Sequence, residues 1–278
     1  MLTHAYVHWL ADVHLAVFAP AFTLSFHDSE CSRKPTNAHS LGRYVQFKKI
    51  KNMRLKTLIL GILFCLTAYS QTNRTENKDF IYWQPETLIQ FADFHKAIDS
   101  VDLKMFEKYK AKSLASVQMH AILDYPKNAR KIKTLKEKWY LAPVFCKECS
   151  PLKEQDSTEL KKTQIYFDIM EYCTRVTRQK IANLETQKKV KDSPGFIAAA
   201  FPGLVDKMYD LMMDMFSSYK REVITEKQPN AHNEWRKTVN QLLESTKDFS
   251  TSEEECKRSM NNKPFSDEYK VSYELYGK

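Results

Sequence analysis

The longest stretch of regularly spaced apolar residues in this chain runs from Asp156 to about Lys188. Asp156-x-x-Glu159 is the pattern of a capping box, in which two side chains satisfy free backbone amides at the start of a helix. The pattern ends at residues 193–195 (SPG), because proline and glycine both interrupt helices. The spacing predicts one long helix, whose apolar face contains Ile165, Ile169, Tyr172, Cys173 and Val176.

Shorter patterns place strands before this helix and further helices after it. Residues 113–125 alternate polar and apolar side chains and form one predicted strand, and 139–145 form a second. A basic, solvated connection over 127–138 joins them. Apolar stripes predict two later helices, over about 202–224 and 230–244. Because strands followed by helices are typical of an α+β domain, we expect a small N-terminal sheet followed by three principal helices.

The front of the chain has the features of an export signal. After Met53, a short basic segment precedes an apolar run over 57–67, which is too short to span a membrane comfortably. Small residues at Ala68 and Ser70 then complete a cleavage motif. We therefore expect an exported protein, periplasmic or secreted, after cleavage near Ser70.

Cleavage at this point divides the chain into segments of different character. Exported proteins do not usually carry a long stretch ahead of the basic segment, so we interpret 1–52 as spurious upstream translation, with a real extension as the alternative. The predicted organisation is this upstream segment, a signal peptide over 53–70, a leader over 71–82, one domain over 83–246 and a loosely held polar C-terminal tail over 247–278.

The charge of the mature part bears on its partners. Residues 71–278 contain 35 Lys and Arg against 31 Asp and Glu, a mild and evenly spread excess of positive charge. Nucleic-acid-binding domains gather a stronger basic patch, so we expect no nucleic-acid partner. No transmembrane helix is expected in the mature chain.

Four cysteines follow the predicted cleavage site: Cys146, Cys149, Cys173 and Cys256. An even number in an exported chain permits disulfides. Cys146-Lys-Glu-Cys149 could be a redox pair, half of a zinc site or a tight disulfide, and the lack of a second C-x-x-C excludes a zinc ribbon with four cysteine ligands. A thioredoxin-like pair opens a helix, whereas Ser150-Pro151 follows at once here, so we favour a structural or adventitious role.

Part of the long predicted helix resembles a known active-site helix. In zinc proteases, H-E-x-x-H places two histidine ligands one turn apart, with a glutamate base between them. A family of exported bacterial proteins, described as secreted zinc-dependent proteases of unknown function, carries H-E-Q-x-H-F-D-I-x-E in this helix. The two histidines and the glutamate are replaced here by Lys162, Tyr166 and Thr163. The positions that match are Gln164, Phe167, Asp168, Ile169 and Glu171.

The resemblance extends over most of the predicted domain. Trp83 and a downstream FADF segment are similar to a tryptophan and a W-x-D-F segment near the start of those proteins. Residues 219–226, followed by Trp235, are similar to a Y-D-x-x-T-x-H-G segment that precedes a Trp-bearing helix. The histidine of that segment, which the resemblance implies is a third ligand, corresponds to Thr225.

The resemblance implies a zincin-like scaffold that has lost its metal centre. Lysine would bring a cation towards the metal position, and threonine and tyrosine oxygens are poor zinc ligands at neutral pH. Lys162, Thr163, Tyr166 and Thr225 are therefore predicted degenerate positions, and we expect no metal, no cofactor and no catalytic residue among them. The matching positions and Trp235 are expected to keep a scaffold role.

Three functions are compatible with these residues. We favour an exported, non-catalytic relative of the zinc proteases that binds a peptide or an envelope partner. One alternative is an active hydrolase with an unrecognised site, although the chain has no G-x-S-x-G motif. The other is a thiol–disulfide protein that uses Cys146 and Cys149.

Overall fold

The computed structural model describes residues 74–132, 134–191, 193–261 and 263–276. The predicted upstream segment (1–52) and signal peptide (53–70) lie outside the described residues. The first strand of the described part begins at Phe80, and the last strand ends at Leu275. The chain from Gln71 onwards therefore contains the whole of the described fold.

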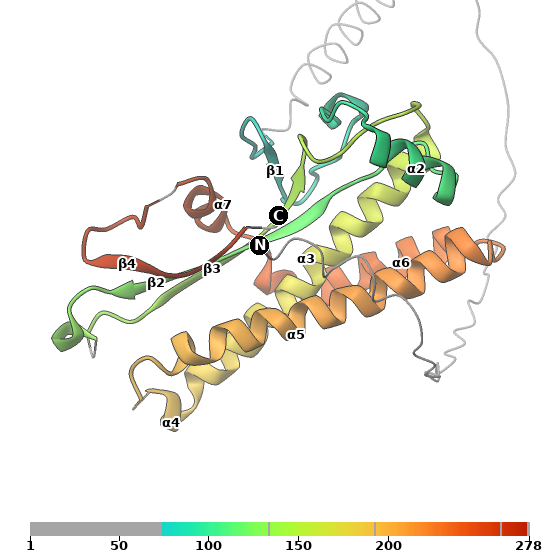
Figure 1. Ribbon diagram of the computed structural model, residues 1–278. Helices are drawn as coiled ribbons and strands as arrows, with labels where there is room; N and C mark the ends of the chain where they lie inside the picture. Colours follow the sequence, from blue (N-terminus) through green and yellow to red (C-terminus); the bar gives the residue numbers. More distant parts are fainter. Residues whose placement is uncertain (1–73, 133, 192, 262, 277–278) are drawn as a thin grey trace, which may run out of the picture. The chain divides into compact units, whose positions relative to one another are not determined.

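A four-stranded antiparallel sheet forms the centre of the fold (Figure 1). In spatial order its strands are β1 (Phe80–Tyr82), β3 (Lys138–Cys146), β2 (Val117–Pro126) and β4 (Tyr269–Leu275). β2 and β3 are the two strands predicted from the sequence, and they form the middle of the sheet. The expected α+β class is confirmed.

Two predicted boundaries are wrong at the ends of the domain. β1 lies in the predicted leader (71–82), yet Ile81 and Tyr82 are buried because they pair with β3 and pack on the core. The predicted polar tail (247–278) contains α7 (Glu253–Met260) and β4, which pairs with β2. The sheet is therefore completed from the C-terminal end of the chain and is not wholly N-terminal.

The C-terminal segment is fixed in spite of its polar composition because its polar groups find buried partners. Arg258 in α7 is fully buried, and its guanidinium donates two hydrogen bonds of 2.7 Å to the carboxylate of Asp124 in β2. Tyr269, at the start of β4, is also buried, and its hydroxyl donates to the Lys136 carbonyl at 3.0 Å. Buried polar groups are stable when they are hydrogen-bonded, so polarity alone does not make a segment loose.

The long predicted helix is α3 (Ser157–Thr186), and it begins at the predicted cap. The Asp156 side chain accepts hydrogen bonds from the backbone amides of Thr158 and Glu159. Glu159, which was expected to complete a capping box, instead accepts a hydrogen bond of 2.7 Å from the ammonium of Lys162.

The two later predicted helices are α5 (Phe196–Tyr219) and α6 (Ala231–Ser245). α5 begins before the predicted start at Pro202, because Ile197 and Phe201 are buried at helical spacing. It continues into a π-helical segment, η3 (Lys220–Thr225). The shorter elements are η1 (Phe91–Asp93), α2 (Ser100–Tyr109), η2 (Ala129–Lys131), α4 (Lys188–Lys191) and η4 (Lys247–Phe249).

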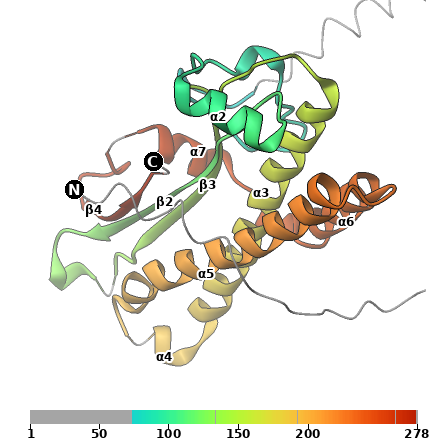
Figure 2. The ribbon, with the colours of Figure 1, turned by 45° about the vertical axis from the view of Figure 1, so that its right-hand side comes forward.

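Helices cover both faces of the sheet. α3 and α5 cover one face, where they bury an apolar core with alternate residues of β2 and β3. α7 lies on the other face, where Cys256 packs against Tyr82, Ala142 and Val144. α5 and α6 both lie against α3 (Figure 2). None of the helices in the described part of the chain is both long enough and apolar enough to cross a membrane.

Candidate functional site

The four predicted degenerate metal positions occupy different environments. Lys162 is half-buried in α3, and its ammonium forms an ion pair of 2.7 Å with Glu159. Thr163 is buried, with 3 % of its surface exposed. Thr225 lies at the end of η3 and is exposed to solvent. Tyr166 is half-buried among other aromatic rings.

These rings form an aromatic cluster of Tyr166, Phe216, Tyr219, His232 and Trp235. The Tyr166 ring meets Phe216 and Tyr219 edge-on, with ring centroids 4.8 and 5.1 Å apart. The Tyr219 hydroxyl lies 2.9 Å from Nδ1 of His232, and its ring contacts Trp235. Burial raises the pKa of Tyr166 to about 12, so its hydroxyl is neutral at physiological pH. Neutral aromatic packing therefore occupies the position at which the resemblance predicts a second histidine.

Asp168 and Gln164 fix α3 to the segment before α2 and to α6. Asp168 is 5 % exposed; its carboxylate accepts hydrogen bonds from Trp83 Nε1 at 2.9 Å and from Arg236 at 2.5 Å. The Gln164 amide donates to the same carboxylate at 3.1 Å, and its oxygen accepts from the Ile89 backbone amide at 3.0 Å. Two side chains on adjacent turns of α3 thus hold two other segments of the chain.

Glu171 holds the connection between α6 and α7. It is fully buried, and its carboxylate accepts hydrogen bonds from Arg175 Nε at 2.7 Å and from the Thr251 backbone amide at 2.9 Å. Arg178 donates to the Thr251 hydroxyl and to the Phe249 carbonyl, each at 2.7 Å. A buried charge is costly unless it is paired and hydrogen-bonded. Glu171, Arg175 and Arg178 each have an ion pair and hydrogen bonds.

The other three matching or scaffold positions also contribute to packing. Phe167 is fully buried in a cluster with Ile81, Trp83 and other apolar residues. Ile169 is fully buried in the core between α3 and the sheet. Trp235 donates its indole N–H to the Glu222 carboxylate at 2.6 Å. All six positions therefore hold or fill the fold.

The four predicted degenerate positions, Lys162, Thr163, Tyr166 and Thr225, do not fit a zinc ion. Zinc is held by thiolate sulfur, imidazole nitrogen or carboxylate oxygen, whereas the four positions offer an ammonium, two threonine hydroxyls and a phenol. Within the described ranges, no three His, Cys, Asp or Glu side chains come together in a way that could hold a metal ion. No catalytic step through zinc follows from this arrangement.

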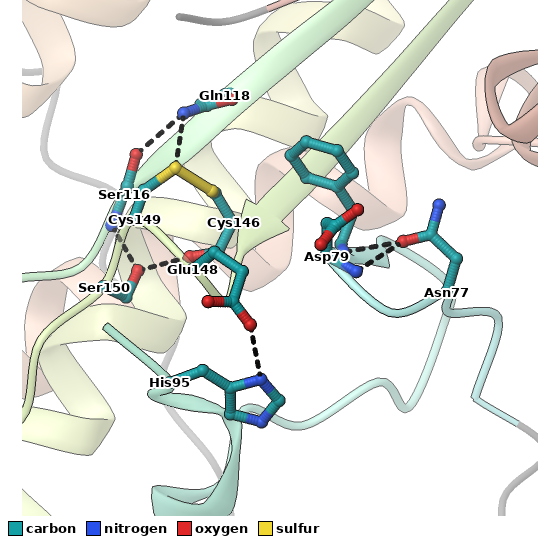
Figure 3. Close-up of a disulfide and its surroundings, with 10 residues drawn as sticks. Asn77, Asp79, His95, Ser116, Gln118, Cys146, Glu148, Cys149 and Ser150 are labelled. Atoms are coloured by element: carbon teal, nitrogen blue, oxygen red, sulfur yellow. Dashed lines mark hydrogen bonds and ion pairs between the residues drawn. A yellow bond between two sulfur atoms is a disulfide. The ribbon is translucent and has the colours of Figure 1, made fainter. Parts of the chain in front are cut away.

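The C-x-x-C pair forms a disulfide at the end of β3 (Figure 3). Cys146 is buried, whereas Cys149 is exposed. The Gln118 amide lies 3.7 Å from the Cys149 sulfur, and the Ser150 hydroxyl donates to the Cys146 carbonyl at 2.7 Å. A side-chain hydrogen bond and a covalent bond therefore close the same short turn.

Segments that are distant in the sequence meet at this turn. The Lys147 backbone amide donates to the Asp79 carbonyl at 2.8 Å, and the His95 amide donates to the Lys147 carbonyl at 3.1 Å. The Ser116 amide donates to the Ser150 hydroxyl at 2.9 Å (Figure 3). A reactive thiol needs exposure and an electropositive setting such as a helix N-terminus. The first cysteine of this pair is buried at the end of a strand, which favours a structural role.

The structure also brings together a polar pair that no local pattern signals. His120 in β2 and Ser259 in α7 are 2 % and 6 % exposed, with Nδ1 2.7 Å from the serine oxygen. The rings of Phe80 and Tyr276 contact the imidazole edge-on. Burial lowers the pKa of His120 to about 4, so it is neutral at physiological pH. Since the pair is covered by aromatic rings, it is part of the core and not an open hydrolase site.

A pocket of about 450 Å³ lies beside the C-terminal half of α3. Arg178 and Lys162 are separated by about 24 Å along α3, at about 1.5 Å per residue. The pocket therefore does not coincide with the predicted metal positions. Its lining is mixed, with aromatic, acidic and basic side chains that include Trp139, Tyr140, Phe249, Asp248, Glu254 and Lys138.

Comparisons of the chain with protein-family models, with curated proteins and with solved structures found no match. The structure itself shows the class of protein, which is an α+β domain with helices on both faces of an antiparallel sheet. The zinc-protease resemblance stays a prediction from the residues that carry it.

Proposed function

We propose that this protein is an exported, non-catalytic relative of the secreted zinc-dependent proteases, and that it binds a peptide or an envelope partner. One observation supports the proposal best. On α3, the three positions that zinc chemistry would need are Lys162 in an ion pair, Thr163 buried in the helix and Tyr166 in the aromatic cluster. All three side chains serve the structure of the domain.

The chemistry of these side chains points away from hydrolysis. Metal-assisted peptide hydrolysis needs a general base that takes a proton from water. Thr163 stands at the position of the glutamate base, and its hydroxyl is no base at neutral pH. Lys162 stands at the first ligand position, where its cation is paired with Glu159.

The retained residues support a binding role because they make the scaffold rigid. Asp168, Gln164 and Glu171 tie α3 to the N-terminal segment, to α6 and to the α6–α7 connection. A rigid surface loses less conformational freedom on association than a flexible one, so more of the contact energy appears as affinity.

Metal content tests the proposal directly. The chain from Gln71, purified without chelator, should contain no stoichiometric zinc by elemental analysis and should show no peptidase activity. Near-stoichiometric zinc, together with peptidase activity that a chelator removes, would overturn the non-catalytic assignment.

A restored variant tests the kinship with zinc proteases. It combines the changes Lys162→His, Thr163→Glu, Tyr166→His and Thr225→His. If the scaffold is zincin-like, this variant should bind zinc, because two histidines at i and i+4 lie on one helix face. Circular dichroism must first show that the variant is folded, because Tyr166→His removes a ring from the aromatic cluster. If it is unfolded, Lys162→His with Thr225→His, which spares that cluster, takes its place.

The matched control is a pair of histidines at the same spacing on another helix. Lys104→His with Lys108→His places them on the exposed surface of α2. The fourfold restored variant should bind zinc more tightly than this control, because Thr225→His adds a third histidine ligand, whereas Thr163→Glu would supply the base and not a ligand. Equal affinity would show adventitious binding to any such pair and would count against the kinship.

The thiol–disulfide alternative has one observation in its favour, which is the exposure of Cys149. Equilibration with glutathione buffers would give the reduction potential of the disulfide. We expect a value below about −300 mV, as for structural disulfides. A potential near the thioredoxin value of about −270 mV or above it would favour a redox role.

A further inference from the structure

The net positive charge of residues 71–278 is concentrated in one turn. Residues 127–138, between β2 and β3, contain six Lys or Arg and one Glu. The rest of 71–278 contains 29 Lys and Arg against 30 Asp and Glu. The expectation of evenly spread charge is therefore wrong, because a single hairpin accounts for the whole excess.

The basic hairpin tip consists of residues 127–132 and 134–137, beyond the last pair of β2 with β3. Its base is fixed from three sides. The Lys127 amide donates to the Glu268 carbonyl at 2.8 Å, and the Tyr269 hydroxyl donates to the Lys136 carbonyl at 3.0 Å. The Glu137 carboxylate accepts from the Ile197 amide at 3.2 Å. Figures 1 and 2 both show the tip projecting at the end of the sheet that lies away from α2.

The side chains of the tip present cations together with some apolar surface. Lys127, Arg130, Lys131 and Lys136 are exposed, and Ile132 and Leu135 between them are half-buried. One acidic side chain, Glu137, belongs to the tip and accepts the hydrogen bond from Ile197. Just before β4, Glu268 forms an ion pair of 2.8 Å with Lys131, and Asp267 precedes it in the sequence. Lys127, Arg130 and Lys136 form no ion pair with another residue in the described part of the chain.

We propose that the basic hairpin tip docks this protein on an anionic phospholipid bilayer. Four exposed cations attract the anionic surface, and the two aliphatic side chains between them can enter the interface, as in other surface-bound segments. A soluble polyanion would use the cations and leave the aliphatic side chains without a role. This surface lies outside α3, so the proposal does not depend on the non-catalytic assignment.

Vesicle co-sedimentation of the chain from Gln71 tests the docking. We expect binding to vesicles that contain phosphatidylglycerol, little binding to pure phosphatidylcholine, and loss of binding at about 0.5 M salt because the charges are screened. A variant that neutralises the tip should bind the phosphatidylglycerol vesicles with a partition coefficient that is lower by at least about tenfold. It carries Lys127→Gln, Arg130→Gln, Lys131→Gln and Lys136→Gln.

A control variant removes the same amount of charge elsewhere. It replaces four exposed lysines, each on a different helix, in the changes Lys104→Gln, Lys180→Gln, Lys207→Gln and Lys237→Gln. Its partition coefficient should stay within about twofold of the parent chain if the tip is the docking surface. Equal losses in both variants, or no preference for phosphatidylglycerol, would overturn the proposal.

Insertion of the tip separates a bilayer from a soluble polyanion. In a Leu135→Trp variant, the added fluorescence should be quenched by brominated phospholipid. If the parent chain binds soluble polyphosphate under conditions where it leaves the vesicles free, or if the added tryptophan is not quenched on vesicles, the bilayer is the wrong partner.

Discussion

The two faces of the central sheet are stabilised in different ways, although the same strands build both. In β2, Met119, Ala121 and Leu123 face α3 and α5, where the core is apolar. His120 and Asp124, which alternate with them, face α7 and its polar partners. Because successive side chains of a strand point to opposite faces, one strand takes part in two unlike interfaces.

The difference lies in what each face requires of its partner. Burial of apolar side chains is favourable with any well-packed apolar surface. A buried charge instead needs one particular partner, as Asp124 has in Arg258. The α7 face is therefore the more specific of the two, and removal of one partner should harm it most.

The largest effect is expected at the ion pair between α7 and β2. Arg258→Ala leaves the Asp124 carboxylate buried without a partner, and removal of one member of a buried pair costs about 3–5 kcal/mol. Urea denaturation should show this loss in the free energy of unfolding. The neighbouring Lys257→Ala, which removes an exposed ion pair with Glu253, should leave stability close to unchanged. Similar behaviour of the two variants would show that α7 does not form a buried interface.

The apolar face should lose somewhat less from a single truncation. Leu123 is 1 % exposed in the core between β2 and the helices. Leu123→Ala should lower the free energy of unfolding by about 3 kcal/mol, from lost transfer free energy and a new cavity. Leu88→Ala provides the matched control, because Leu88 is 62 % exposed. A cost for Leu123→Ala that exceeds the cost of Arg258→Ala would reverse the comparison of the faces.

The polar face should also be the pH-sensitive one. Burial lowers the pKa of His120 from 6.5 to about 4, so the unfolded chain takes up a proton at higher pH than the folded chain. The resulting stability is fully present above pH 6.5 and declines as the pH falls towards 4, by up to about 3 kcal/mol. Unfolding measured along this range should show a shallower decline in His120→Gln. If stability declines equally with falling pH in the parent protein and in His120→Gln, a group other than His120 causes the pH dependence.

The smallest of these effects is expected from the disulfide. It closes a turn of only four residues, from Cys146 to Cys149, and a loop of this size should contribute about 2 kcal/mol. The melting temperature should fall when a dithiol reductant is added. In Cys146→Ser with Cys149→Ser, the melting temperature should be lower and insensitive to the reductant. A parent protein that melts at the same temperature in both conditions would show that the disulfide adds no stability.

The candidate site shows where prediction from the sequence reached its limit. The sequence alone shows Lys162, Thr163 and Tyr166 where the zinc-protease resemblance predicts two histidines and a glutamate. The sequence does not show which residues contact Tyr166 and Asp168, because their partners Tyr219 and Arg236 belong to other helices. The His120–Ser259 pair is separated by 139 positions, and each residue looks ordinary in its own neighbourhood.

By itself, the sequence determined α3 with its Asp156 cap, α6, the hairpin strands β2 and β3 and the C-x-x-C motif. These features depend on side-chain spacing and on hydrogen bonds within a few residues, so local patterns encode them. Only the tertiary structure decided that a polar C-terminal segment supplies β4 and the buried Arg258. The physical reason is that a buried charge is stable only beside its partner, and Asp124 lies 134 positions away in the chain.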